Sequence, residues 1–372
     1  MARIPVAVVG ATGMVGQRII AMLDGHPQFE LREVASSART AGKRYGSAAT
    51  WRVPAAMPDG VGDLTLKEGG SRLDSGVVFS AMPGGPATAI ERGYAAAGKV
   101  VVSNSSSYRM DPRVPLVIPE VNADHLKLVR SQGTPGGIVT NCNCAAMFLT
   151  MALAPLHRRY GVEAVQVTTM QAVSGAGYPG VASLDILGNV FPLPAEEEKM
   201  ERETQKMLGS VADGVVTPAP FPVSAQCQRV PVEDGHTETV SVRLSGHPGP
   251  GDVAAALRDF RGRPQVQGLY SAPPRPIEVF EQEDRPQPRL DANRHGGMAA
   301  SVGRIRACPV FTVKMLVLGH NLMRGAAAAA MLNAEAMLAM DLLPARQAAA
   351  TTSHPKAGEA GVGADVKVPA NA

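Results

Sequence analysis

The sequence predicts an α/β protein with two domains: an N-terminal domain built on a parallel sheet, and an α+β domain with a mixed, largely antiparallel sheet. Two observations support this prediction. The first third of the 372 residues alternates short, almost wholly apolar runs with helical patterns, which is typical of strands covered by helices on both faces. In the middle third, apolar and polar residues alternate within each run, which is typical of a sheet with helices on one face.

The elements follow from these patterns in chain order. In the first domain we expect strands at residues 4–9, 31–35, 77–80, 100–103 and 138–140, and helices at 17–23 and 86–97. In the second we expect an apolar helix at 147–156, alternating strands at 164–169, 237–244 and 310–318, and a helix at 324–342. The predicted domains are residues 1–140 and 141–323, followed by a helical segment at 324–345 that returns to the first domain. Residues 346–372 lack periodicity and are expected to form a disordered tail.

The composition excludes several classes of protein. The 36 basic and 33 acidic residues give a net charge of +3, too small an excess for a protein that binds nucleic acid or a membrane surface. No run approaches eighteen apolar residues, and the N-terminus lacks the layout of a signal peptide. Four cysteines are too few for a disulfide scaffold, and no metal-ligand set stands out. We therefore expect a cytoplasmic enzyme that acts on a small molecule.

The first strand is followed by a glycine-rich turn and a helix. Gly10, Gly13 and Gly16 lie where a dinucleotide pyrophosphate binds in a Rossmann-type domain, and glycine lets the backbone approach the phosphates. The spacing is G-x-x-G-x-x-G rather than the commoner G-x-G-x-x-G, and the alternative is a tight turn without a ligand. The candidate cofactor contacts in this loop are Gly10, Thr12, Gly13, Met14 and Val15.

The end of the second strand distinguishes the two nicotinamide cofactors. An NAD site usually has an Asp or Glu there, which binds the ribose hydroxyls. Residues 36–43 (SSARTAGK) contain no carboxylate, and Glu33 lies inside the strand. Hydroxyl groups followed by a guanidinium suit a 2′-phosphate, so the sequence favours NADP, although Arg39 and Lys43 could also be ordinary solvated charges. The candidate contacts are Ser36, Ser37, Arg39 and Thr40.

Two cysteines stand between a strand and a helix, in residues 141–146 (NCNCAA). A thiol at a helix N-terminus is expected to have its pKa lowered from ~8.5 toward neutrality. Cys144 is nearer to the helix and Cys142 is nearer to the strand, and both could instead be small buried hydrophobes. A nucleotide-binding loop upstream favours a covalent thioester intermediate. His236, which closes a polar turn seven residues after Arg229, is the candidate base.

Taken together, these motifs resemble the aspartate-β-semialdehyde dehydrogenase family over nearly the whole chain, up to about residue 335. The resemblance is strongest to the archaeal and fungal branch, and it extends beyond residues 9–16 and 141–144. The further motifs are residues 103–110 (SNSSSYRM), 171–177 (QAVSGAG), 196–199 (EEEK), Arg229 with His236, and 319–326 (GHNLMRGA).

The resemblance implies an NADP-dependent phosphorylating aldehyde dehydrogenase of amino-acid biosynthesis. In the biosynthetic direction such an enzyme reduces L-aspartyl-4-phosphate to L-aspartate 4-semialdehyde and releases phosphate. By position, Cys144 is the implied nucleophile, His236 the acid and base, and Gln171 the residue that orients the acyl group. The family also suggests homodimers or dimers of dimers.

The same resemblance implies a set of substrate and cofactor contacts. Arg229 would bind the α-carboxylate, and Glu196 would bind the amino group. Arg109 and Lys199 would bind the phosphate through charge-assisted hydrogen bonds. The implied cofactor contacts in the second domain are Ser174, Gly175 and Asn321.

The chain departs from the family pattern at two positions. Cys142 replaces a proline, and Ala145 replaces the Ser or Thr that follows the nucleophile. Loss of the proline restores an N–H and frees the turn. Two alternatives therefore stay open: an acyl-CoA reductase similar to those that act on malonyl-CoA, and an NADP-binding regulatory protein without turnover. Glu196, Lys199, Arg109 and Arg229 favour the aspartyl substrate, because malonyl-CoA has no amino group for Glu196.

Overall fold

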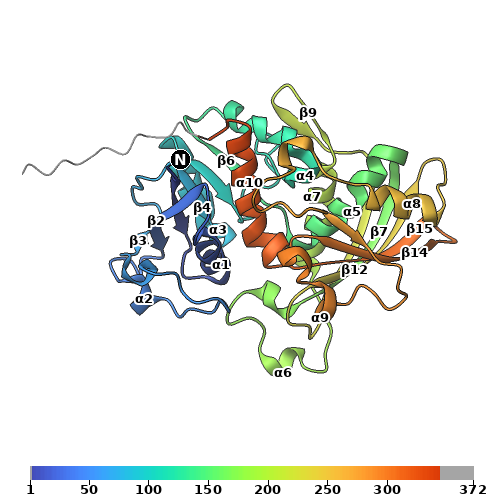
Figure 1. Ribbon diagram of the computed structural model, residues 1–372, viewed down its shortest axis with the longest axis horizontal. Coiled ribbons are helices and arrows are strands. Elements are labelled where there is room, and N and C mark those ends of the chain that lie inside the picture. The colour runs from blue at the N-terminus through green and yellow to red at the C-terminus, as the bar shows by residue number, and fades with distance from the viewer. Residues whose placement is uncertain (1, 344–372) are drawn as a thin grey trace, which may run out of the picture.

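The computed structural model describes residues 2–343 and contains two sheets side by side (Figure 1). The first is a six-stranded parallel sheet in the order β3-β2-β1-β4-β5-β6. The second has seven strands in the order β13-β14-β15-β12-β7-β11-β8, and a two-stranded ribbon pairs β9 with β10. In the second sheet four of the six neighbouring pairs are antiparallel, so the predicted fold class is confirmed.

The strands and helices have the following bounds. The strands are β1 (Ile4–Val9), β2 (Phe29–Ser36), β3 (Lys67–Glu68), β4 (Val77–Ser80), β5 (Val100–Ser103), β6 (Gly137–Thr140), β7 (Val162–Gln171), β8 (Phe191–Pro192), β9 (Ser210–Ala212), β10 (Val215–Thr217), β11 (Val223–Arg229), β12 (His236–Leu244), β13 (Ile277–Val279), β14 (Ala300–Ala307) and β15 (Val313–Gly319). The α-helices are α1 (Met14–Leu23), α2 (Tyr45–Ala48), α3 (Gly84–Ala96), α4 (Pro119–Asn122), α5 (Cys144–Tyr160), α6 (Ser183–Ile186), α7 (Pro194–Met207), α8 (Pro250–Arg258), α9 (Pro288–Asp291) and α10 (Ala328–Ala339).

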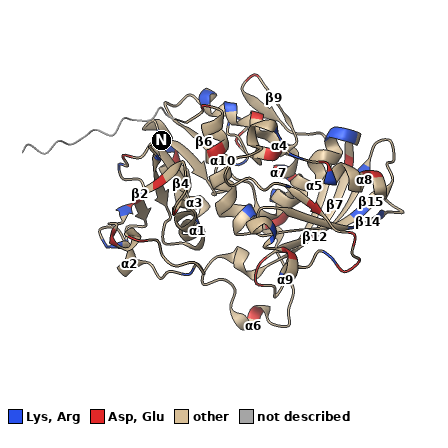
Figure 2. Cartoon of the chain, viewed as in Figure 1, with Lys and Arg blue, Asp and Glu red and all other residues tan. Residues whose placement is uncertain are grey.

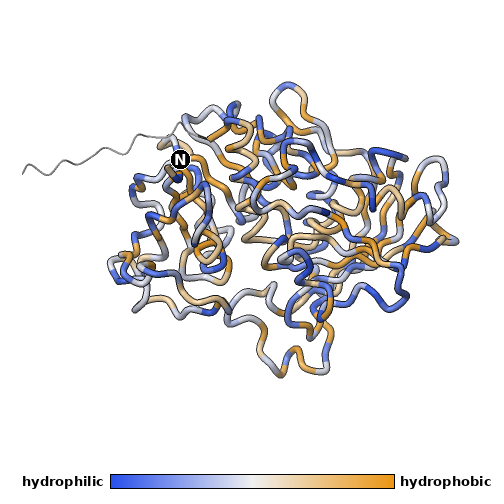
Figure 3. Tube along the Cα trace, in the orientation of Figure 1, coloured by the Kyte–Doolittle hydropathy of each residue, from blue (hydrophilic) through white to orange (hydrophobic). Residues whose placement is uncertain are grey.

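The first sheet is buried on both faces, as its apolar strands predict. All four residues of β4, β5 and β6 are buried, and only one residue of β1 is exposed. All five pairings are parallel, so the carboxyl ends of the strands lie at one edge. Figure 3 shows the hydrophobic residues concentrated inside both halves of the molecule, and Figure 2 shows the charged residues spread over its helices and loops.

The second sheet has one covered and one open face. Along β7, β11 and β12, buried residues alternate with exposed or half-exposed ones, and the buried set packs with α5 in one core. The open face is polar and largely uncharged; it includes Gln166, Thr168, Ser224, Gln226, Thr237 and Thr239. Predicted strand 310–318 begins only at Val313, because residues 308–312 form the turn from β14.

The C-terminal helix packs into the core of the first sheet. Ala330, Met331, Ala334 and Met337 of α10 belong to the same buried cluster as the side chains of β1 and α1. Residues 323–327 form a π-helical turn before α10, so the regular helix is shorter than the predicted 324–342.

We propose residues 140 and 323 as domain limits. The tail predicted at 346–372 lies outside the described residues, and no helix within 2–343 is long and apolar enough to span a bilayer.

A buried ion pair joins this C-terminal segment to α4. The Arg324 guanidinium donates two hydrogen bonds of 2.6 Å to the two carboxylate oxygens of Glu120, and the side chains are 0% and 2% exposed. Because both ions are removed from water, each depends on the other for its stability.

Removing one partner should therefore destabilise the fold. We expect Arg324→Met to lower the free energy of unfolding by about 3–5 kcal/mol, because Glu120 is left buried and unpaired. The measurement is urea denaturation followed by circular dichroism. Arg44→Met is the matched control, since Arg44 pairs with Asp63 at 3.0 Å on the surface and its loss should leave the midpoint almost unchanged. Equal midpoints for the two variants would contradict the prediction.

Candidate active site

Cys144 and His236 lie in contact, although 92 residues separate them. Cys144 is the first residue of α5 and His236 is the first residue of β12, and the Cys144 Sγ lies 3.1 Å from the His236 Nε2. Asn143 caps the helix, because its Oδ1 accepts hydrogen bonds from the N–H groups of Ala145 and Ala146 at 3.0 and 3.1 Å. The cap fixes the turn that presents the thiol.

The second ring nitrogen of His236 determines where its proton sits. The Nδ1 accepts a hydrogen bond of 3.0 Å from the backbone N–H of Ala172. An accepting Nδ1 carries no proton, so in the neutral ring the proton is on Nε2, which faces the thiol. His236 therefore presents a donor to the sulfur. The Ala172 N–H opposes a proton on Nδ1 and hence the imidazolium form in this geometry, and the role of His236 as acid and base stays a prediction.

The electrostatics agree with a neutral thiol and a neutral imidazole. Burial, with Arg229 and His320 nearby, lowers the pKa of His236 to about 3. Burial also raises the pKa of Cys144 to about 12, helped by the Glu196 carboxylate and opposed by Arg109 and Arg229. The expected fall of the Cys144 pKa toward neutrality is therefore wrong for this structure. The helix N-terminus acts in the expected direction, but the loss of water around the sulfur outweighs it.

Cys142 occupies a different environment from Cys144. It is 1% exposed, and its thiol points to the Met147 Sδ at 3.9 Å. Burial raises its pKa above the ordinary range. Replacement of the family's proline by Cys142 thus leaves the cap of Asn143 intact, and the structure separates the two thiols that the residues alone could not distinguish.

Gln171 and Arg229 reach the site because they end two neighbouring parallel strands. They are register partners at the ends of β7 and β11. The Arg229 Nη1 donates to the Ala172 carbonyl at 2.7 Å, and the Gln171 Nε2 lies 3.3 Å from the Thr169 Oγ1. A Cβ on Gly175 would lie 2.9 Å from the Arg229 Nη1 and 3.1 Å from the His236 Cε1, so glycine is needed where this turn covers them.

Helix α7 supplies a second set of charges. The Lys199 Nζ donates to the Glu196 Oε1 at 2.6 Å, and the Glu196 Oε2 accepts from the Asn143 Nδ2 at 2.5 Å. These hydrogen bonds lower the pKa of Glu196 despite its burial. Arg109 comes from the other domain, where its Nη2 donates to the Asn104 carbonyl at 2.9 Å. The structure therefore brings all the predicted substrate residues to the vicinity of Cys144.

Two buried residues of the same helix were missed by the sequence interpretation. Glu203 accepts from the Arg109 Nη1 at 3.1 Å, and Lys206 donates to three backbone carbonyls of residues 109–114. A signal was present, because these charges follow Glu196 and Lys199 at intervals of four and three residues, which places all four on one helix face. The family motif drew attention only to the first two.

The glycine-rich loop lies at the carboxyl edge of the parallel sheet. Gly10 has φ +79°, and a Cβ there would lie 2.5 Å from the Ala81 carbonyl oxygen. No side chain caps α1, so the first-turn N–H groups of Met14 and Val15 are free to meet an anion. The Thr12 hydroxyl lies 3.0 Å from that of Ser36, which joins this loop to the end of β2. These features fit a dinucleotide.

The end of β2 presents hydroxyls and a guanidinium, but no free carboxylate. Ser36 is buried, whereas Ser37 and Arg39 are exposed, and the Thr40 hydroxyl turns back to the Ser37 carbonyl at 3.2 Å. Glu33 is engaged elsewhere, since it accepts from the Lys67 Nζ at 2.6 Å and from the Ser75 hydroxyl at 2.6 Å. These bonds lower its pKa to about 2 although burial opposes the shift. The residues fit a 2′-phosphate better than free ribose hydroxyls.

Asn321 links the two turns beside His236. Its Oδ1 accepts from the Gly235 N–H at 2.9 Å, and its Nδ2 donates to the Ser174 hydroxyl at 2.8 Å. In this structure its amide therefore holds the turn of residues 173–176 next to the one that ends at His236. Residues 2–343 contain no cluster of His, Cys, Asp or Glu that could hold a metal ion.

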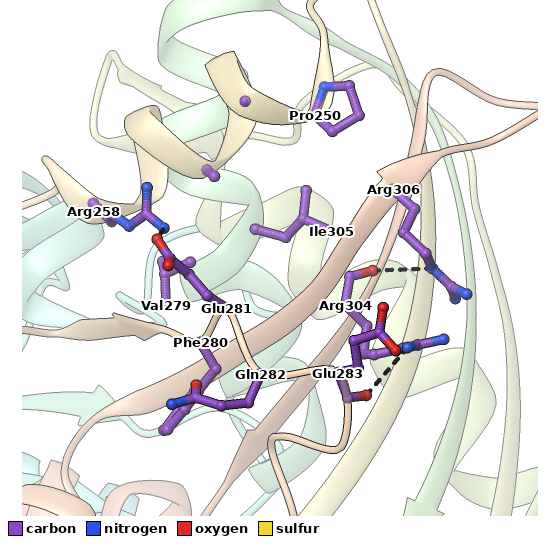
Figure 4. A pocket seen from close by; sticks show the side chains of 12 residues that line it. Pro250, Arg258, Val279, Phe280, Glu281, Gln282, Glu283, Arg304, Ile305 and Arg306 are labelled. Carbon is purple, nitrogen blue, oxygen red and sulfur yellow. Dashed lines mark hydrogen bonds and ion pairs between the residues drawn. The ribbon is translucent and has the colours of Figure 1, made fainter.

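A hollow lies on the second domain, between α8 and strands β13 and β14 (Figure 4). It measures about 390 Å³ and is lined by residues such as Arg258, Phe280, Glu281, Arg304 and Arg306. Arg258 is already paired with Glu281 at 2.6 Å. None of the predicted site residues lines this hollow, so it is separate from the thiol site.

The fold and the site together suit one class of protein: a nicotinamide-nucleotide-dependent oxidoreductase, here with a thiol in contact with a histidine and with two arginines nearby. Comparisons with known proteins narrow this class. Residues 5–129 match the model of the semialdehyde dehydrogenase NAD binding domain, and residues 153–324 match that of the semialdehyde dehydrogenase dimerisation domain.

Full-length relatives agree with these matches. The chain is 49% identical over 339 residues to the aspartate-semialdehyde dehydrogenase of Methanothermobacter thermautotrophicus, covering 89% of this chain and 97% of that protein. It is 43% identical over 357 residues to that of Saccharomyces cerevisiae, covering 90% and 98%. A crystal structure of the Candida albicans enzyme with NADP superposes with a TM-score of 0.85 at 41% identity, covering 91% and 99%. The chain belongs to the aspartate-semialdehyde dehydrogenase family, and the resemblance inferred from sequence is confirmed.

The raised thiol pKa has a direct consequence for reactivity. In the absence of substrate, we expect the alkylation rate of Cys144 by iodoacetamide to increase steadily from pH 7 to pH 10, because the thiolate is the nucleophile and its fraction increases tenfold per pH unit well below the pKa. The measurement is mass spectrometry of the Cys144 peptide. Cys308 is the internal control: a hydrogen bond from the Phe311 N–H lowers its pKa, so its rate should level off at lower pH. A rate for Cys144 that is flat from pH 6 to pH 8 would indicate a thiolate–imidazolium pair instead.

Proposed function

We propose that the chain catalyses the NADPH-dependent conversion of L-aspartyl-4-phosphate to L-aspartate 4-semialdehyde and phosphate. The observation that carries the proposal is the contact between Cys144 and His236, surrounded by Arg109, Arg229 and Lys199. A thiol supplies the covalent step, and three cations suit a substrate that has a carboxylate at one end and a phosphate at the other.

NADP is the proposed cofactor, and when bound it supplies or accepts the hydride. The supporting features are the uncapped N-terminus of α1 and the hydroxyls and guanidinium after β2. The related Candida albicans enzyme was crystallised with NADP. Ser174, Gly175 and Asn321 would contact the nicotinamide side from the second domain, and Gly10, Thr12, Gly13, Met14 and Val15 would contact the pyrophosphate.

Each charged end of the substrate has a proposed partner. Arg229 would bind the α-carboxylate, because within residues 2–343 its planar guanidinium donates to the Ala172 carbonyl alone and still has free N–H groups. Glu196 would bind the amino group, and Arg109 with Lys199 would bind the phosphate. Gln171, register partner of Arg229, would orient the acyl oxygen. The related Vibrio cholerae enzyme II, solved in complex with ASA, superposes with a TM-score of 0.73 at 26% identity, covering 91% of this chain and 99% of that one.

The chemistry of the thiol follows from its surroundings. Attack of the Cys144 sulfur on the acyl carbon forms a thioester; the bond between the acyl carbon and the phosphate oxygen breaks, and the thiol proton leaves with the departing phosphate. The His236 Nε2–H would first stabilise the thiolate and then the oxygen of the tetrahedral intermediate that precedes release of the aldehyde. A full proton transfer to or from His236 requires the Ala172 N–H contact to yield, because that contact disfavours a proton on Nδ1.

We also propose that two copies pair through the open face of the second sheet. That face carries exposed polar side chains on β7, β11 and β12, and it belongs to the region that matches a dimerisation domain. The segment around α6 projects from the body in Figure 1, and its Leu184 and Leu187 are 89% and 66% exposed. Apolar side chains this exposed suit a protein partner.

A cytoplasmic location is our inference from the thiols. Cys142, Cys144, Cys227 and Cys308 are all free in the structure. A reducing compartment keeps such thiols unpaired and a nucleophilic cysteine active.

The reaction is tested by oxidation of L-aspartate 4-semialdehyde with NADP, comparing phosphate with coenzyme A as the acceptor. We expect turnover with phosphate and none with coenzyme A, because Arg109 and Lys199, the proposed phosphate contacts, suit a small anion. Cys144→Ser should abolish turnover, and Cys142→Ser should retain a substantial part of it, since only Cys144 contacts His236. Turnover with coenzyme A alone would support an acyl-CoA reductase, and binding of NADP without turnover would support a regulatory protein.

The residues proposed to bind the two ends of the substrate can be distinguished by comparing the kinetics of their variants. Removal of one charged partner of a desolvated pair typically costs ~2–5 kcal/mol, or on the order of 30- to several-thousand-fold in kcat/KM. Arg229→Ala should therefore lower kcat/KM for the semialdehyde, whereas Lys199→Ala should mainly raise the KM for phosphate. An unchanged phosphate KM in Lys199→Ala would leave this lysine as no more than the ion-pair partner of Glu196.

Cofactor choice is tested at Arg39. We expect the parent chain to prefer NADP strongly over NAD, and Arg39→Ala to weaken NADP binding far more than NAD binding, because only NADP has the 2′-phosphate. The measurement is kcat/KM for both cofactors at fixed ionic strength. Arg32→Ala is a control for net charge, since Arg32 lies on β2, before the turn that carries Arg39, and pairs with Glu30 at 3.1 Å. Equal losses for the two cofactors would contradict the assignment.

A further inference from the structure

Glu203 on α7 is buried at the active site, yet the proposed mechanism gives it no task. Its side chain is 3% exposed. One carboxylate oxygen, Oε1, accepts from the Arg109 Nη1 at 3.1 Å, and the other, Oε2, accepts from the backbone N–H of Asn143 at 2.5 Å. A single carboxylate thus bridges the arginine proposed to bind phosphate and the residue that precedes the nucleophile.

The neighbouring charges on the helix make contacts of the same kind. Glu196 binds the side chain of Asn143, whereas Lys206 donates to the carbonyls of Arg109, Asp111 and Val114 at 2.6, 2.7 and 2.8 Å. All three ammonium N–H groups of Lys206 are therefore used on the segment that carries Arg109. Helix α7 contacts both the arginine segment and the thiol turn, each through more than one residue.

We propose that Glu203 is a positioning residue that fixes the separation between the Arg109 guanidinium and the Cys144 thiol. The need for a fixed separation comes from the substrate, and in this respect the inference rests on the proposed function. In an acyl phosphate, one oxygen joins the phosphorus to the acyl carbon, so a group that binds the phosphate and a nucleophile that attacks the carbon must be held at matching positions.

The contacts of Glu203 do more than neutralise the charge of the buried Arg109. A carboxylate that only balanced the charge of Arg109 would have no need to accept from the Asn143 N–H as well. Arg109 and Cys144 also belong to segments 35 residues apart that follow different strands, β5 and β6. Glu203, from a helix that follows β7 and β8, touches both segments with one carboxylate oxygen each, whereas the other described link between them, from the Asn141 amide to the Asn104 Oδ1, reaches neither Arg109 nor the turn residue next to Cys144.

The test compares Glu203→Gln and Glu203→Leu with the parent chain. A glutamine has one carbonyl oxygen, so it can accept from only one of the two donors, and a leucine can accept from neither. Glu198→Gln is the matched control, because Glu198 lies on the same helix with its side chain 73% exposed and pairs only with Arg202. The readouts are kcat and the phosphate KM in semialdehyde oxidation, the alkylation rate of Cys144 by iodoacetamide without substrates, and the melting temperature.

We expect kcat/KM for phosphate to fall on the order of 10²-fold in Glu203→Gln, with a change in the Cys144 alkylation rate, while Glu198→Gln matches the parent. If Glu203→Leu does not fold, Glu203→Gln alone decides. A lower melting temperature with parental kcat, phosphate KM and alkylation rate would show a purely structural ion pair and overturn the proposal. Absence of phosphate-dependent turnover in the parent would defeat the proposed function instead, and the alkylation rates would still decide whether Glu203 positions Cys144.

Discussion

Pairing of buried charge is the constraint on which the thiol site depends. An ion removed from water is costly unless a partner of opposite charge and good geometry is present. Arg109 meets this condition through Glu203, and the half-buried Glu196 is paired with the half-buried Lys199. Arg229 differs, since the described residues offer it a carbonyl partner and no carboxylate. The guanidinium left without a counter-ion is thus the one proposed to receive the substrate carboxylate.

The backbone scaffold delivers these residues from distant parts of the sequence. Parallel strands β7 and β11 end together, which places Gln171 beside Arg229, and antiparallel β12 begins at the same edge with His236. On the other side, the Asn141 amide donates to the Asn104 Oδ1 at 2.8 Å and to the Ala326 carbonyl at 2.9 Å. The ends of β5 and β6 are thereby tied to the segment that leads into α10. The first domain, the thiol turn and the C-terminal helix form one connected unit.

Much of this arrangement could be predicted from sequence, for physical reasons. Strands buried on both faces must be apolar, and a helix that follows a glycine-rich turn has free N–H groups at its start. The strands and the nucleotide-binding loop of the first domain can therefore be predicted from short stretches of sequence. The second sheet can be predicted from the alternation of apolar and polar residues along its strands. The roles of Lys206 and Glu203 were not predicted, because a sequence does not distinguish a buried charged side chain from a solvated one. Only the tertiary fold shows that Lys206 binds the Arg109 carbonyl and that Glu203 binds Arg109 and Asn143.

The pKa of the thiol was missed for a related reason. A helix N-terminus is visible in the sequence, whereas the partial burial of Cys144 depends on the segments packed around it. A neutral thiol is a weak nucleophile, so its attack depends on loss of the proton when the substrate binds. A substrate carboxylate bound to Arg229 would neutralise that guanidinium and raise the pKa of the Cys144 thiol further. Stabilisation of the thiolate and of the developing oxyanion must therefore come from hydrogen-bond donors that face the sulfur and the acyl oxygen. The Nε2–H of His236 is such a donor, and the Ala172 N–H holds it in the required tautomer.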